Sequence, residues 1–155
     1  MPVIDCRFFN GYKPCGKNAN CDASCPHRDV PQMRLLVVHL GAMGAVLRST
    51  ALLAAMKRQF PSSHITWVTQ APMHRVLVTD PWIDRVLTTS EDDQLILSAL
   101  EFDAAFVIDK SLAAMGIMRR TQVDLRDGFT HDPRTGAILP ATVAARELWE
   151  LGLDD

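Results

Sequence analysis

The hydrophobic pattern of this chain changes at Arg34. From there, short apolar runs alternate with segments whose apolar residues recur at helical spacing, and Pro, Gly or Asp residues separate many of them. The run LLVVHL at 35–40 is continuous rather than alternating, which is typical of a strand buried on both faces of a parallel sheet. The pattern therefore predicts strands and helices in alternation over 34–155.

The individual elements follow from the same pattern. Strands are predicted at 35–40, 64–70, 83–89 and 102–110, with a weaker one at 122–128. Helices are predicted at 44–60, 71–80, 91–101, 111–119 and 141–151, and Gly152 is the expected residue after the last helix. This alternation predicts an α/β fold with a Rossmann-like parallel sheet flanked by helices. Because LGLDD follows the last helix without a closing strand, we expect a domain of a longer protein.

Residues 1–33 have a different composition, rich in Cys, Asn, Lys, Pro and Gly, and predict a loop-rich cap. All four cysteines lie here, at Cys6, Cys15, Cys21 and Cys25. Four thiolates can complete a tetrahedral structural zinc site, or hold an iron–sulfur cluster. Free buried thiols and disulfides are the other readings of the same residues. Zinc is the preferred prediction, because nothing else suggests redox chemistry and a cap with little core would gain folding energy from a metal.

Composition and charge exclude several classes of function. The 155 residues are 48% hydrophobic and 22% charged, with a formal net charge of −2, as expected for a globular protein without broad attraction to nucleic acid or anionic membranes. The first residues lack the apolar core of a signal peptide, and the longest uncharged run is too short to span a bilayer. We therefore expect a cytoplasmic protein whose membrane contact, if any, is peripheral.

The stretch LGAMGAVLRST at 40–50 lies where the first strand would turn into a helix. Ligands of doubly wound sheets bind at this edge. The pattern leaves two interpretations of Gly41 and Gly44 open: close packing that excludes a Cβ, or backbone N–H groups that face an anionic or polyhydroxyl ligand. Between His39 and Arg48 there is no acid, hydroxyl or nucleophile.

The segment RLLVVHLGAMGAVLRSTALLAAMKRQFPSSHITWVTQ resembles the opening of the bacterial heptosyltransferases, glycosyltransferase family 9. Later segments agree with that family over essentially the whole chain: DPWIDRV, FDAAFVIDK, DPRTGAILP and RELWELGLDD. The cysteine-bearing N-terminus also looks like an extension found in one branch of the family.

The resemblance implies a GT-B glycosyltransferase, which has two Rossmann-like domains and inverts the anomeric carbon without a required metal. Residues 34–155 would be the N-terminal, acceptor-side domain, and its acceptor a lipopolysaccharide-core-like saccharide at the inner face of the inner membrane. The donor, a nucleotide-sugar such as ADP-heptose, would bind a C-terminal domain that this chain does not contain.

The resemblance also implies the site residues. The family's proposed general base, an Asp in the glycine turn, corresponds to Ala45, whose methyl group cannot accept a proton. This chain is therefore expected to be inactive alone, and natural loss, an engineered knockout and recruitment of another base all remain open. Asp109 is the alternative acid, with a helix N-cap or a salt bridge as its structural role. Expected substrate-binding residues are Gly41, Ala42, Met43, Gly44, Arg48, Thr50 and Lys110.

A different class of function is compatible with the same residues. A non-catalytic Rossmann-like module that binds a saccharide or a protein, with a metal-stapled cysteine cap, would need neither a base nor a donor domain. A metal-dependent regulatory domain, in which the cap is the functional part, is a third and weaker hypothesis.

Overall fold

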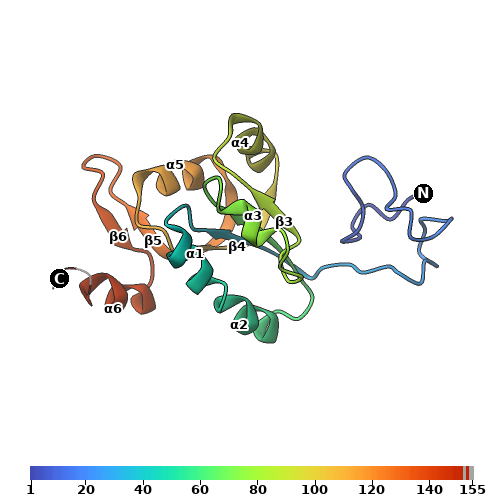
Figure 1. Cartoon of the computed structure of the whole chain (residues 1–155), viewed down its shortest axis with the longest axis horizontal. Helices are drawn as coiled ribbons and strands as arrows, with labels where there is room; N and C mark the ends of the chain where they lie inside the picture. The colour runs from blue at the N-terminus through green and yellow to red at the C-terminus, as the bar shows by residue number, and fades with distance from the viewer. Residues whose placement is uncertain (152, 154–155) are drawn as a thin grey trace.

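A computed structural model describes residues 1–151 and 153 and shows one six-stranded sheet flanked by helices (Figure 1). The strands are β1 (Met33–Val38), β2 (Ser63–Val68), β3 (Arg85–Leu87), β4 (Glu101–Val107), β5 (Gln122–His131) and β6 (Ile138–Pro140). The helices are α1 (Met43–Ser49), α2 (Leu52–Gln59), α3 (His74–Leu77), α4 (Glu91–Ser98), α5 (Leu112–Arg120) and α6 (Val143–Leu151).

The strand order is β3-β2-β1-β4-β5-β6. The first five strands are parallel, and only β6 runs antiparallel, beside β5. This order places β1 in the middle and makes the chain cross over between β3 and β4, as in doubly wound folds. The predicted α/β, Rossmann-like fold class is therefore confirmed.

Strand β1 is buried on both faces. Leu35 to Val38 have no exposed surface, and their side chains alternate between two hydrophobic clusters. Leu35 and Val37 pack in the cluster that includes Val46, Leu53 and Trp67. The other cluster receives Leu36 and Val38, together with apolar residues of α4 and α5. The continuous apolar run in the sequence reflects these two separate cores.

The predicted helix at 44–60 is interrupted. Two helices, α1 and α2, are separated by Thr50 and Ala51. The Thr50 and Ala51 N–H groups bond to carbonyls three residues earlier, and the Thr50 hydroxyl donates to the Leu47 carbonyl at 2.7 Å. Such i to i−3 bonds tighten the last turn of a helix and change its course. The hydrophobic period alone could not indicate this break.

The strand β6 was not predicted. The segment at 132–137 reverses the chain, with the Gly136 backbone at φ +77°, and Ile138–Pro140 then pair with Phe129–His131. The strand is only three residues long and ends in proline, so its pattern is too short to recognise. Trp149 of α6 donates its indole N–H to the Ile138 carbonyl at 2.8 Å and so holds α6 against this hairpin.

Residues 1–32 contain no helix, no strand and no fully buried residue. They form a lobe at one end of the sheet domain, drawn in blue in Figure 1. Arg7 connects this lobe to the sheet: its guanidinium bonds to the Asp29 carboxylate, to the Asp84 carboxylate and to the Ser63 carbonyl. We refer to residues 1–32 as the cap.

Two further predictions from the sequence concern membrane-spanning segments and the residue that follows the last helix. No helix in the described part of the chain is both long and apolar enough to cross a membrane. The predicted helix-terminating residue, Gly152, lies outside the described residues.

His64 of β2 is a buried histidine among charged neighbours. Only 7% of the residue is exposed, and burial lowers its pKa to about 4. The positive charges of Arg85, Arg34 and Arg7 act in the same direction, while Asp84 opposes them. His64 is consequently a neutral imidazole in the folded protein near pH 7.

This burial predicts a pH-dependent stability. Between pH 6.5 and about 4, His64 is protonated in the unfolded chain but remains neutral in the folded chain. The free energy of unfolding therefore falls as the pH drops through this range. We expect a loss of about 2 kcal/mol between about pH 7.5 and about pH 5, measured by urea unfolding.

The His64→Gln variant, which cannot titrate, should show a clearly smaller difference between the two pH values, whatever its absolute stability. Part of the pH dependence of stability should remain in the variant, because the pKa of His39 is also lowered in the folded protein. An equal slope in the variant and the wild type would contradict the assignment.

Candidate functional site

The turn between β1 and α1 lies at the carboxyl edge of the sheet, beside the end of β4. Ala42 is the N-cap of α1, with an extended backbone, and its carbonyl accepts from the Ala45 and Val46 N–H groups. Ala42, Met43 and Gly44 are exposed, while Ala45 is partly buried. The predicted substrate-binding residues of the turn therefore form a continuous surface, with Ala45 at its inner side.

Neither glycine of the turn is required by packing. A Cβ at Gly41 would first meet Gln70 Oε1 at 3.9 Å, and one at Gly44 would meet Arg48 Nη1 at 3.7 Å, both ordinary contacts. Neither glycine has a positive φ angle. The interpretation that close packing excludes a Cβ is therefore wrong for both positions. What the glycines do provide is backbone without a side chain of its own, partly exposed at Gly41 and exposed at Gly44.

A histidine and a serine lie beneath the turn. His39 Nδ1 is 2.6 Å from Ser49 Oγ, and the Ser49 hydroxyl donates to the Ala45 carbonyl at 2.9 Å. Because Ser49 has one hydroxyl hydrogen, Nδ1 must carry the hydrogen that it shares with Ser49, and Nε2 is left as the basic nitrogen of neutral His39. The structure thus links His39, Ser49 and Ala45 in one chain of hydrogen bonds.

His39 adds no charge to the turn near pH 7. Burial lowers its pKa, and the positive charge of Arg48 lowers it further, although Asp109 and a backbone hydrogen bond at Gly41 oppose this shift. Ser49 was not predicted from the sequence as the partner of His39. A serine ten residues after His39 does not indicate a contact in the sequence, because the contact depends on the angle between α1 and β1.

Asp109 braces the turn from the neighbouring strand. It follows β4, is 9% exposed, and accepts the Leu40 N–H on Oδ2 at 2.8 Å and the Ser111 N–H on Oδ1 at 2.9 Å. The N-cap of α5 is Ser111, not Asp109, because the Ser111 hydroxyl accepts the Ala114 N–H. Both Asp109 oxygens thus hold backbone N–H groups, an arrangement that favours positioning of the turn over action as a free acid.

The remaining predicted residues are divided between two places. Arg48 is exposed and its guanidinium lies over Gly44. The Thr50 hydroxyl is bonded to the α1 backbone, so it does not face the turn as a free donor. Lys110 Nζ lies 5.0 Å from the ring centroid of Phe129 on β5, within cation–π distance. The structure therefore gathers Gly41–Arg48 on one surface and directs Lys110 towards β5.

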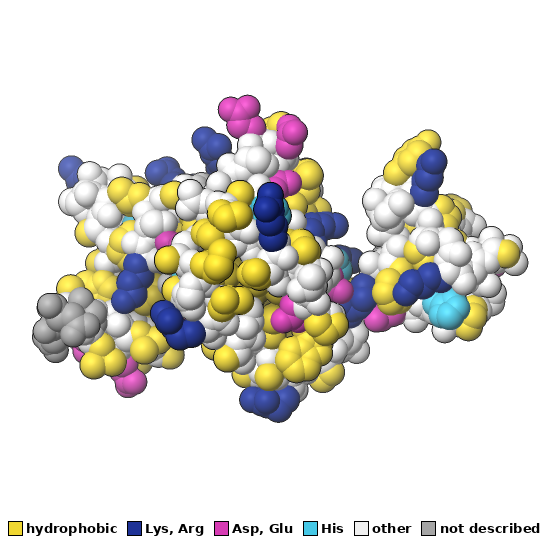
Figure 2. All heavy atoms as spheres, in the orientation of Figure 1, with side chains coloured by type: hydrophobic (Ala, Val, Ile, Leu, Met, Phe, Trp, Pro, Cys, Tyr) yellow, Lys and Arg dark blue, Asp and Glu magenta, His cyan; other side chains and the backbone are white. Residues whose placement is uncertain are grey.

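Exposed apolar side chains continue from this turn. Met43, Leu47 and Leu52 are each about half exposed, and Figure 2 shows hydrophobic side chains gathered over the face that α1 and α3 present. Met43, one of the predicted substrate-binding residues, is 45% exposed and so is not part of the core.

Sequence reasoning also missed a hollow of about 250 Å³ between α6 and the carboxyl ends of β4 and β5. Gly128 lies at its floor with φ +93°, and a Cβ there would overlap the Val107 carbonyl. Asp127 beside it accepts from the Thr142 hydroxyl at 2.6 Å. The dipeptide Asp127–Gly128 was the available signal, but an isolated Asp-Gly pair more often marks a turn.

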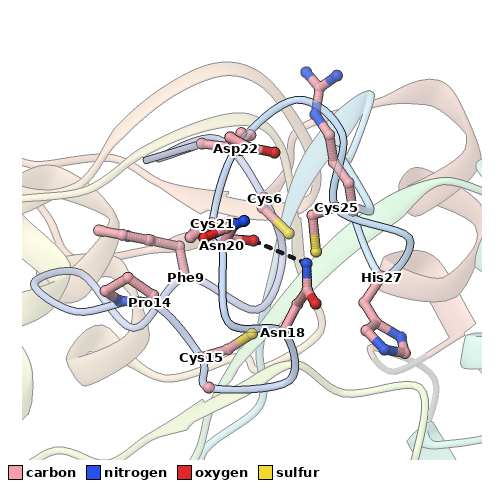
Figure 3. Close-up of a pocket in the computed structure, with 13 residues that line it drawn as sticks. Cys6, Phe9, Pro14, Cys15, Asn18, Asn20, Cys21, Asp22, Cys25 and His27 are labelled. Carbon is pink, nitrogen blue, oxygen red and sulfur yellow. Dashed lines mark hydrogen bonds between the residues drawn. The ribbon is translucent and has the colours of Figure 1, made fainter. Parts of the chain in front are cut away.

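The four cysteines are all free thiols, and together with His27 they line one small cavity in the cap (Figure 3). In residues 1–151 and 153, no three Cys, His, Asp or Glu side chains are placed closely enough to hold one metal ion.

Comparison with known proteins supports the fold. No protein-family model matches the sequence, and no curated protein matches it. Among solved structures, the chain is similar to E. coli heptosyltransferase WaaC with ADP, at 19% identity and a TM-score of 0.58, over 78% of this chain and 47% of that one. WaaC with ADP-2-deoxy-2-fluoro heptose gives 17% identity and 0.57, over 79% and 49%.

A glycosyl transferase family 9 protein from Veillonella parvula gives 18% identity and a TM-score of 0.55, over 65% of this chain and 32% of that one. This chain thus spans about a third to a half of the length of these proteins. The fold is that of the heptosyltransferases of glycosyltransferase family 9, which confirms the resemblance seen in the sequence at the level of the fold.

The role of Asp109 in holding the turn predicts a stability effect. Replacing Asp109 by Ala leaves the Leu40 and Ser111 N–H groups without their acceptor, and we expect the free energy of unfolding to fall by about 3 kcal/mol. Asp124, exposed on β5, is the matched control, and Asp124→Ala should change stability by less than about 0.5 kcal/mol. Equal stability of the two variants in urea unfolding would refute the bracing role.

Proposed function

We propose that this chain is the acceptor-side domain of a heptosyltransferase-like glycosyltransferase. The reaction would transfer a sugar from a nucleotide-sugar of the ADP-heptose type to a lipopolysaccharide-core-like saccharide, without a metal. The turn at 40–48 would receive the acceptor. The donor would bind a second domain outside this chain, so the chain alone would not catalyse transfer.

The observation that carries the proposal is the uncovered glycine turn at the carboxyl edge of β1. Its glycines are not explained by backbone angle or by close packing, and Asp109 and the His39–Ser49 pair hold the turn from behind. In a doubly wound sheet this edge is where ligands bind. The fold similarity to WaaC with ADP and with a fluorinated ADP-heptose agrees with this class of reaction.

The chemistry that the side chains of the turn itself lack is a carboxylate that could accept a proton. Attack by an acceptor hydroxyl on the anomeric carbon requires a base, and Ala45 offers only a methyl group where the resembling family carries Asp. Ala45 lies at the inner side of the turn, and its carbonyl is engaged by Ser49. A carboxylate side chain at this position would leave that hydrogen bond in place, because the bond uses the Ala45 backbone.

A second candidate function is a non-catalytic module that binds a saccharide or a protein. Ala45 favours it, because a binding surface needs no base, and so do the exposed Met43, Leu47 and Leu52, which add apolar contact area around the turn.

Restoring the base is the test that separates the two functions. In the intact protein that contains this chain, Ala45→Asp should raise the turnover of ADP-heptose with a deacylated lipid A–core acceptor at least about 100-fold, the usual contribution of a general base. Ala45→Asn is the matched control, because it has nearly the same size and cannot accept the proton. Release of ADP, followed by mass spectrometry of the glycosylated acceptor, measures the reaction.

Equal turnover of the Asp and Asn variants would contradict the missing-base account. Acceptor binding without turnover in any variant would favour the binding module. Transfer by residues 1–155 alone would contradict the proposal that the donor domain lies elsewhere.

A further inference from the structure

The cap cannot be held together by a hydrophobic core. None of its 32 residues is fully buried, and its local structure consists of turns and bends. A segment of this size that buries so little apolar surface normally depends on a disulfide, a metal or a partner. Disulfides are absent here, since all four cysteines are free.

The four cysteines nevertheless belong to one cavity. Cys6, Cys15, Cys21 and Cys25 all line a single cavity, although they come from separate turns of the cap (Figure 3). Its volume is about 20 Å³, close to the space of one water molecule or one ion and too small for an organic ligand. A cavity of this size, lined by every cysteine of the chain, fits a single soft cation.

The backbone around these cysteines is shaped by tight turns. The Cys6 carbonyl accepts the Phe9 N–H at 3.0 Å, and the Cys25 carbonyl accepts the Arg28 N–H at 3.1 Å. Cys6 Sγ itself accepts the Asp29 N–H at 3.5 Å, which fixes the Cys6 side chain against the backbone of the cap. After Cys15, Gly16 takes φ +76°, which reverses the chain towards the cavity.

We propose that Cys6, Cys15, Cys21 and Cys25 bind one Zn²⁺ as four thiolates in a tetrahedral site. Binding releases the thiol protons and changes no oxidation state. Four thiolates around Zn²⁺ leave a net charge of −2, and the cavity lining holds one arginine, Arg28, whose guanidinium lies 3.9 Å from the Asp5 carboxylate, and one carboxylate, Asp22. In the arrangement described, no three donors are yet close enough to share an ion, so the turns must draw inward when the metal binds. Such closure is the ordinary behaviour of small metal-dependent domains.

The zinc site would secure the attachment of the cap to the sheet. Arg7 directly follows Cys6 and bonds to Asp29 at 2.7 Å and to Asp84 at 2.6 Å. Although burial lowers the pKa of Arg7, hydrogen bonds and charge from Asp29 and Asp84 outweigh it and raise the pKa, so the arginine remains charged. Asp84 also accepts the Ile65 N–H of β2. A metal that fixes Cys6 thereby fixes the arginine that anchors the cap, and this role is independent of glycosyl transfer.

Zinc content is the direct test. Protein purified without chelator should contain one zinc per chain by elemental analysis, and each Cys→Ser variant should lose most of it. Ser24→Ala, in an exposed cap residue beside Cys25, and His27→Ala are the matched controls and should keep one zinc per chain. Substitution by Co²⁺ should give the thiolate-to-metal absorption of a tetrahedral four-sulfur site.

A chelator gives a second readout that does not depend on how the variants fold. Stripping zinc from the wild-type protein should expose the cap to limited proteolysis and raise amide exchange at 1–32, while the sheet domain keeps its circular dichroism. Four thiols that react at once without denaturant, in a protein that takes up no zinc, would overturn the proposal. A brown protein with iron and acid-labile sulfide would also overturn it, in favour of an iron–sulfur cluster.

Discussion

The burial of β1 on both faces is the constraint from which the rest of the structure follows. Its last four residues, Leu35 to Val38, have no exposed surface, and they belong alternately to the two cores that hold the flanking helices. A strand with this pattern is stable only in the interior of a sheet, with a paired strand on each side. Strands β2 and β4 occupy those sides, and the parallel pairing of β1 with β4 places the carboxyl end of β1 beside that of β4.

The candidate site is a consequence of that placement. Because β1 and β4 end side by side, Asp109 can reach the Leu40 N–H, and α1 can bring Ser49 back onto His39. The turn itself carries almost no chemistry; its shape is determined by groups behind it, and its outer surface is glycine backbone, small side chains and Met43. In the proposed function this surface would receive a saccharide, whose hydroxyl groups can bond to exposed backbone, and the missing carboxylate at Ala45 would limit catalysis rather than binding.

The sequence predicted those parts of the fold that depend on local patterns. Runs of apolar residues and turn residues indicated the buried strands, the alternation of strands with helices, and the glycine turn. The break after Ser49, the short strand β6 and the double role of Asp109 were not, because each depends on hydrogen bonds formed only when the elements meet. The same reasoning applies to the cap. The four cysteines in the sequence led to the prediction of a shared metal site, but only the folded chain shows that all four line one cavity.

The central claim is that the uncovered turn at the carboxyl edge of β1 receives a saccharide. The most direct measurement is a titration of isotopically labelled protein with the deacylated lipid A–core saccharide, followed by backbone amide NMR. If the turn receives the saccharide, the Gly41–Arg48 amides and the end of β4 should show saturable shifts, with little change in the cap. Saturable binding whose shifts fall elsewhere, or no binding at millimolar saccharide, would contradict it.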